Sequence, residues 1–144
     1  MSAALHEAVR PCVLSGDLWV SVDAHPRTAA HVEWAIRDEV RRLCAIFDPR
    51  DPASEFSQWR LGGTELPSPD LTYVLTMSER LWVFSQGAFH PGVEPLRRRW
   101  RDAEAAGITP SKLEMRELAS SLELPYTTMH GPVQRLGDCS AVEL

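Results

Sequence analysis

The chain has 144 residues, which is enough for one domain with a buried core. Its hydrophobic share of 44% and charged share of 24% are those of an ordinary globular protein, and a formal net charge of -5 argues against binding to nucleic acid. No stretch approaches the roughly 20 apolar residues of a membrane span, and the first ten residues lack the apolar core of a signal peptide, so we expect a cytoplasmic protein that does not bind membranes.

The first predicted element is a strand over residues 17–23, where side chains alternate between two faces. His25 and Pro26 end it, and a long helix is expected over residues 28–47. This helix carries one apolar stripe at steps of three and four, formed by Ala29, Val32, Ile36, Val40, Leu43 and Phe47.

Residues 48–67 are predicted to form a loop with room for one helical turn, because prolines lie near its start and Gly62-Gly63 near its end. A loop of about 20 residues is unusual in a compact domain and is often functional. Ser68-Pro69-Asp70 then has the pattern of a helix start, and Gly87 that of a helix end. The expected buried face of this helix consists of Leu71, Val74, Leu75, Leu81 and Trp82.

Two further helices are expected, one from Pro95 to Gly107 and one opened by Thr109-Pro110. Their inward-facing residues are predicted to be Leu96, Trp100 and Ala103 in the first, and Met115, Leu118, Ala119 and Leu122 in the second. Residues 126–136 favour two short strands around His130-Gly131.

This order predicts an α+β fold in a single domain, residues 1–144, with helices packed on a mostly antiparallel sheet. One strand near Leu18 cannot stand alone. We therefore expect the sheet to be incomplete in this chain, and its missing strands to come from outside these residues.

The three cysteines, Cys12, Cys44 and Cys139, are widely spaced and form no C-x-x-C pair. The pattern indicates neither a zinc site nor a disulfide framework, and reduced thiols are expected. The histidines His6, His25, His31 and His130 are scattered without the spacing of metal ligands.

Two motifs stand out. Arg42-Leu43-Cys44-Ala45-Ile46-Phe47 is followed by Asp51-Pro52-Ala53-Ser54-Glu55-Phe56-Ser57-Gln58-Trp59, in which Ser54 and Glu55 can simply cap a short helix. Gly87-Ala88-Phe89-His90-Pro91-Gly92-Val93 joins two helices with small residues that let a ligand approach the backbone. The alternative is an ordinary turn in which Phe89 fills the core.

In this order and at these spacings, the motifs resemble the ApbE family of FAD:protein FMN transferases. In that family the second segment usually reads S-E-L-S-x-x-N or S-E-L-S-x-W, and the third reads G-A-F-D-P-T-V. Residues 133–139, Val-Gln-Arg-Leu-Gly-Asp-Cys, are similar to the strand that follows in a subgroup. The resemblance runs from about Pro11 to Leu144 and corresponds to the N-terminal portion of the family.

The resemblance implies an ApbE/T-fold-like fold, FAD as substrate, Mg²⁺ as cofactor, and an acceptor flavoprotein whose Ser or Thr hydroxyl receives FMN. Carried over by position, the flavin contacts fall on Leu14, Arg50, Ala88, Phe89 and His90. Three positions depart from the family pattern. His90 replaces an acidic or amide residue, Gly16 replaces a threonine, and Arg50 replaces an aromatic ring, although a guanidinium plane also stacks on rings.

The family's lysine motif, roughly G-x-x-K-G-x-x-x-D, would begin just after Leu144, and its metal-binding Asp and Thr residues would follow. Lys112 is the only lysine here and lies in the first turn of a predicted helix. We therefore expect these 144 residues to need a missing C-terminal half or a second chain for catalysis. The alternative is a non-catalytic flavin-binding or partner-binding subunit whose sheet a second chain completes.

Four arginines follow the Gly87–Val93 motif: Arg97, Arg98, Arg99 and Arg101. They can either reach the pyrophosphate of a flavin or form the solvated face of a helix.

Overall fold

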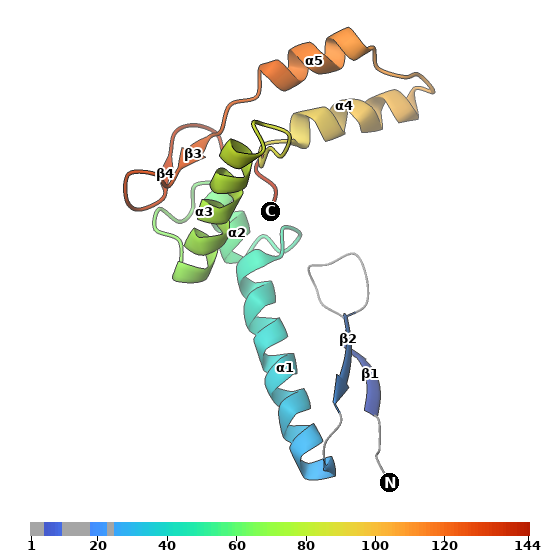
Figure 1. Cartoon of the computed structure of the whole chain (residues 1–144), viewed down its shortest axis with the longest axis vertical. Helices are drawn as coiled ribbons and strands as arrows, with labels where there is room; N and C mark the ends of the chain where they lie inside the picture. The colour runs from blue at the N-terminus through green and yellow to red at the C-terminus, as the bar shows by residue number, and fades with distance from the viewer. Residues whose placement is uncertain (1–4, 10–17, 23–24) are drawn as a thin grey trace. The chain divides into compact units, whose positions relative to one another are not determined.

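The computed structural model describes residues 5–9, 18–22 and 25–144. The chain divides into two compact units, residues 1–57 and residues 58–144 (Figure 1). Helices dominate both units, and the strands form two separate two-stranded sheets within the described residues.

In the first unit, strand β1 (Leu5–Val9) pairs antiparallel with strand β2 (Leu18–Val22), with Leu5 opposite Val22 and Val9 opposite Leu18. The predicted strand is confirmed as β2. Its neighbour lies within the chain, in a segment where no strand was predicted, so the expectation that its partner comes from elsewhere is wrong for this edge.

Helix α1 (Pro26–Phe47) confirms the long predicted helix and begins two residues earlier, because Pro26 fits the first helical turn. Its predicted stripe is buried at Ala29 and mostly half-buried beyond it. Cys44 in this helix is disulfide-bonded, so the expectation of reduced thiols is wrong for Cys44. Cys139 is a free, buried thiol.

Helix α2 (Glu55–Arg60) forms where a single helical turn was expected. Ser54 caps it, since the N–H of Ser57 donates to Ser54 Oγ at 3.2 Å. The Ser54 hydroxyl in turn donates to the carbonyl of Asp48 at 2.6 Å, which ties the helix start to the end of α1. The capping interpretation of this motif is therefore confirmed.

Helix α3 (Pro69–Phe84) is the central helix of the second unit. Its first turn is capped as predicted, because Ser68 Oγ accepts the N–H of Leu71 at 3.3 Å. Leu71 and Leu75 are fully buried, but Leu81 is 46% exposed, so the predicted buried face is wrong at Leu81.

Helices α4 (Glu94–Ala105) and α5 (Lys112–Ser120) follow and contact each other (Figure 1). Arg99 on α4 donates to both carboxylate oxygens of Glu114 on α5. Ala103 is buried as predicted. Trp100 is 50% exposed and Ala119 is exposed, so the predicted inward orientation is wrong at these two residues. Met115, Leu118 and Leu122 are half-buried, although α5 has no fully buried residue.

Strands β3 (Tyr126–Thr127) and β4 (Gln134–Arg135) pair antiparallel and confirm the two short strands predicted in this region. The second unit buries Trp59, Leu71, Leu75, Ala103, Tyr126, Cys139 and Val142 completely. Trp59 meets Tyr126 edge-on with ring centroids 5.5 Å apart, and the Tyr126 hydroxyl donates to the Leu75 carbonyl at 3.2 Å. These contacts fix β3 against α3 and complete a helix-rich α+β fold.

Candidate functional site

The chain leaves α3 through a tight turn that leads into the Ala88–His90 segment. Gln86 and Gly87 both have positive φ, at 53° and 86°, and the Gly87 N–H donates to the Trp82 carbonyl at 3.0 Å. Gly87 therefore ends the helix as predicted, because glycine adopts this backbone conformation without steric cost.

Ser85 holds the next residues of the turn. Its carbonyl accepts the N–H of Ala88 at 3.1 Å, and its hydroxyl oxygen accepts the N–H of Phe89 at 2.9 Å. The Phe89 ring is 40% exposed, so the alternative that Phe89 fills the core is wrong. The turn presents an aromatic face to its surroundings.

His90 is held on several sides. Its Nδ1 accepts the N–H of Gly92 at 3.0 Å, and its ring meets the Trp82 indole edge-on at a centroid distance of 5.9 Å. Burial lowers the pKa of His90, while the backbone of Leu122 acts to raise it. The imidazole is therefore an acceptor fixed within the turn in its neutral form.

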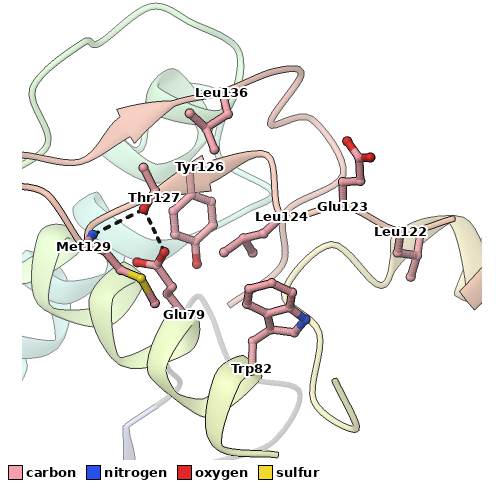
Figure 2. A pocket seen from close by; sticks show the side chains of 9 residues that line it. All are labelled: Glu79, Trp82, Leu122, Glu123, Leu124, Tyr126, Thr127, Met129 and Leu136. Carbon is pink, nitrogen blue, oxygen red and sulfur yellow. Dashed lines mark hydrogen bonds between the residues drawn. The ribbon is translucent and has the colours of Figure 1, made fainter. Parts of the chain in front are cut away.

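A pocket of about 340 Å³ opens between α3 and residues 122–136 (Figure 2). Trp82 connects the pocket to the turn, since its indole both lines the pocket and contacts His90. Most of the lining is apolar, and its polar groups are two carboxylates and two hydroxyls. The lining residues are Glu79, Trp82, Leu122, Glu123, Leu124, Tyr126, Thr127, Met129 and Leu136.

Glu79 is the buried polar residue of the pocket wall. Its carboxylate accepts the Thr127 hydroxyl at 2.9 Å, the Thr128 N–H at 2.7 Å and the Thr128 hydroxyl at 2.5 Å. Three donors from one short segment satisfy a charge that burial would otherwise make costly. The wall between α3 and β3 is thus fixed by hydrogen bonds rather than by apolar packing alone.

Tyr126 forms the inner boundary of the pocket. Burial raises the pKa of its hydroxyl well above the usual range, and the nearby Glu79 charge acts in the same direction. Because this hydroxyl stays protonated and already donates to Leu75, Tyr126 has a structural role here.

The five residues assigned to the flavin site by resemblance do not all lie in the same part of the described structure. Ala88, Phe89 and His90 lie together in the turn of the second unit. Arg50 belongs to the first unit, where its side chain is exposed and its Nε lies 3.8 Å from Asp48 Oδ1. Leu14 lies outside the described residues.

The arginine run on α4 is largely occupied by carboxylates. Arg97 pairs with Glu143, Arg99 with Glu114, and Arg101 with Glu94. The side chains of these ion pairs are partly exposed, as expected for a solvated helix face. In the described part of the chain, these three guanidinium groups are thus directed at carboxylates.

Glu79 and Trp82 were not identified as site residues from the sequence. A signal for them exists, because both follow Leu75 at helical steps and share the buried side of α3 with Ser78. An acidic residue on such a face indicates a partner from elsewhere in the fold, but the pattern does not say that the partner is the Thr127–Thr128 segment.

Within residues 5–9, 18–22 and 25–144, no three His, Cys, Asp or Glu side chains gather as metal ligands do. The same part of the chain contains no helix long and apolar enough to cross a membrane.

Comparison with known proteins identifies the family of this chain. No curated protein and no solved structure matches the chain. The model of the ApbE family matches residues 17–138, which include α1, the Ser54 cap, the Ala88–His90 turn and the pocket. Since this match covers most of the 144 residues, the chain belongs to the ApbE family.

Proposed function

We propose that this chain supplies part of the FAD site of an ApbE-type FAD:protein FMN transferase. The supporting observation is that Trp82 both lines the pocket and contacts His90 of the Ala88–His90 turn. The apolar and aromatic lining of the pocket suits a planar ring. Its volume of about 340 Å³ is at the lower end of the range for ligand pockets, so it accommodates one ring system of FAD rather than the whole molecule.

Phe89 has an exposed aromatic ring one residue before His90, whose imidazole contacts Trp82 of the pocket wall, and we assign Phe89 to stack on the ligand. Ala88 keeps the backbone accessible because its side chain is small. Arg50 and Leu14 are assigned to the site only by their position in the family pattern. For Arg50, the assigned role is stacking of its guanidinium group on a ring of FAD.

In the proposed reaction the Ser or Thr hydroxyl of an acceptor flavoprotein attacks the FMN-side phosphorus of FAD, and AMP leaves. Magnesium would neutralise the pyrophosphate oxygens. The described residues do not fit a magnesium site, because they contain no group of three ligands. The function assigned to this chain is therefore FAD binding and orientation.

The test is FAD affinity, measured by isothermal titration calorimetry and by quenching of tryptophan fluorescence. Phe89→Ala should weaken FAD binding about tenfold, which corresponds to about 1.4 kcal/mol for the lost ring contact. Phe84→Ala is the matched control, because Phe84 is also an exposed phenylalanine, 88% exposed at the end of α3. Equal effects of the two substitutions, or no FAD binding by the unmodified chain, would contradict the proposal.

A second candidate is a non-catalytic subunit that binds flavin or a partner chain. It is favoured by the two-stranded sheets, since a sheet edge can pair with a strand from another chain. Stable FAD binding without FMN transfer, even after the lysine-bearing C-terminal half of a flavin transferase is added as a second chain, would select this candidate.

A further inference from the structure

The Ala88–Gly92 turn is closed by a side chain that does not usually close such turns. The N–H of Gly92 donates to Nδ1 of His90 at 3.0 Å. Aspartate and asparagine commonly make this bond, with a side-chain oxygen that accepts the N–H two residues later. Here an imidazole nitrogen takes the place of that oxygen, so the ring must be neutral with its proton on Nε2.

The imidazole has little freedom to move. The Trp82 indole packs against it from α3 at an interplanar angle of 78°, and its Nε2 is buried without a hydrogen-bond partner among the described residues. The following residue, Pro91, is also held, because its carbonyl accepts the N–H of Glu143 at 2.8 Å. The ring is thus confined between α3 and a turn that is itself fixed to the C-terminal segment.

Gly92 provides the space that this ring needs. A Cβ placed on Gly92 would lie 3.2 Å from Cε1 of His90 and 3.3 Å from Nδ1. Contacts this short require the ring to move by a few tenths of an ångström, while the same ring packs edge-on against Trp82. Gly92 has no positive φ, so the requirement for glycine comes from the neighbouring ring and not from the backbone conformation.

We propose that His90 and Gly92 are a matched pair, in which the imidazole closes the turn as an acceptor and the missing side chain at position 92 makes room for it. His90 is then a positioning residue that sets the direction of Phe89, rather than a group that contacts the flavin. The family pattern G-A-F-D-P-T-V has aspartate and threonine at these two positions. The family pattern thus combines a short acceptor at position 90 with a larger side chain at position 92. This chain combines the longer histidine side chain with glycine, which has no side chain.

A double-mutant cycle tests the pairing, with His90→Asp, Gly92→Thr and the combined variant compared in urea. Gly92→Thr alone should lower the unfolding midpoint most, because the new side chain collides with the ring. The combined variant should recover much of that loss, since aspartate accepts the same N–H from less space. Additive losses in the two single variants and the combined variant would overturn the pairing.

The positioning role of His90 can be tested separately by hydrogen exchange of the Gly92 amide. His90→Ala should speed hydrogen exchange of this amide by about tenfold, as expected for the loss of one hydrogen bond, while His90→Asn should restore its protection. Nitrogen chemical shifts of the unmodified ring should show the proton on Nε2. Unchanged exchange in His90→Ala, or a proton on Nδ1, would refute the assignment.

The expected effect of His90 on FAD affinity rests on the proposed function, whereas the pairing of His90 with Gly92 does not. If FAD affinity falls in His90→Ala and returns in His90→Asn, His90 acts through the turn. If His90→Asn stays as weak as His90→Ala although the Gly92 amide is protected again, the imidazole contacts FAD and the positioning role is wrong. Failure of the unmodified chain to bind FAD would remove the proposed function and leave the urea and exchange results to decide the pairing.

Discussion

At Glu79, a carboxylate lies among buried residues of α3 and accepts three hydrogen bonds from Thr127 and Thr128. Glu79→Gln would replace one carboxylate oxygen with an amide nitrogen, which donates and cannot accept. The Thr128 N–H or a threonine hydroxyl would then lack its acceptor. We expect the free energy of unfolding to fall by about 1–3 kcal/mol, measured by urea denaturation.

Glu117→Gln is the matched control for this change. Glu117 is exposed on α5, so the same substitution should alter the free energy of unfolding by less than about 0.5 kcal/mol. Similar effects of the two substitutions would mean that the threonine hydrogen bonds contribute nothing specific to the contact between α3 and β3.

His90 makes stability depend on pH in a predictable direction. Burial lowers its pKa in the folded protein below the ordinary value of 6.5. The unfolded chain therefore binds a proton at a higher pH than the folded chain does, and the stability from the neutral ring is present above pH 6.5 and lost as the pH falls through the lowered pKa. No charged side chain causes the lowered pKa of His90. Arg80 and Glu123 are the charged residues nearest in sequence to Trp82 and Leu122, and neither contributes to the change.

The measurement is the difference in unfolding free energy between the unmodified chain and His90→Asn across pH 5 to 8. Asparagine accepts the Gly92 N–H but does not titrate in this range. The unmodified chain should lose stability relative to the variant as the pH falls below 6.5. Parallel curves would show that the ring is protonated equally in the folded and unfolded states.

Among the elements, α3 depends on the conformation of its last turn. Gly87 has a φ of 86°, which costs an alanine about 1–2 kcal/mol even though the nearest atom to an added Cβ is 3.9 Å away. Gly87→Ala should therefore lower the free energy of unfolding by that amount. Gly137→Ala, where an added Cβ meets open space and φ is not positive, should leave it nearly unchanged in the same thermal or urea melts.

The helix boundaries were predictable because their signals are local. Ser68, Pro69 and Gly87 mark the ends of α3 through their own hydroxyl, ring and backbone preferences. The exposure of Leu81 and Trp100 was not predictable in this way. Periodicity identifies residues that share a helix face, whereas burial of that face depends on which neighbouring element covers it.

Strand pairing shows the same limit across a longer distance in sequence. The short segment Leu5–Val9 pairs with β2, but its five residues alone carry too weak an alternation to predict a strand. The hydrogen bonds from Thr127 and Thr128 to Glu79 join residues 48 and 49 positions apart. The turn at Ala88–His90 was predictable from the motif, while the pocket between α3 and residues 122–136 depends on such distant contacts.

For the whole molecule, family membership and catalytic capacity are separate matters. The match over residues 17–138 includes the turn and the pocket, to which we assign ligand binding. Cleavage of a pyrophosphate also needs positive charge that neutralises oxygens on both sides of the bond. Three of the four arginines after the turn already face carboxylates, and Lys112 is the exposed first residue of α5.

We therefore expect the 144-residue chain to bind FAD without transferring FMN. The purified chain would be mixed with FAD, magnesium and a threonine-bearing acceptor flavoprotein, and the intact mass of the acceptor would be followed over time. A complete flavin transferase of the family serves as the positive control. The acceptor mass should stay unchanged while FAD affinity, measured in the same solution, remains sensitive to Phe89→Ala. An FMN adduct formed by the chain alone would mean that its own residues stabilise the transition state, because transfer without neutralised phosphate oxygens would be too slow to detect.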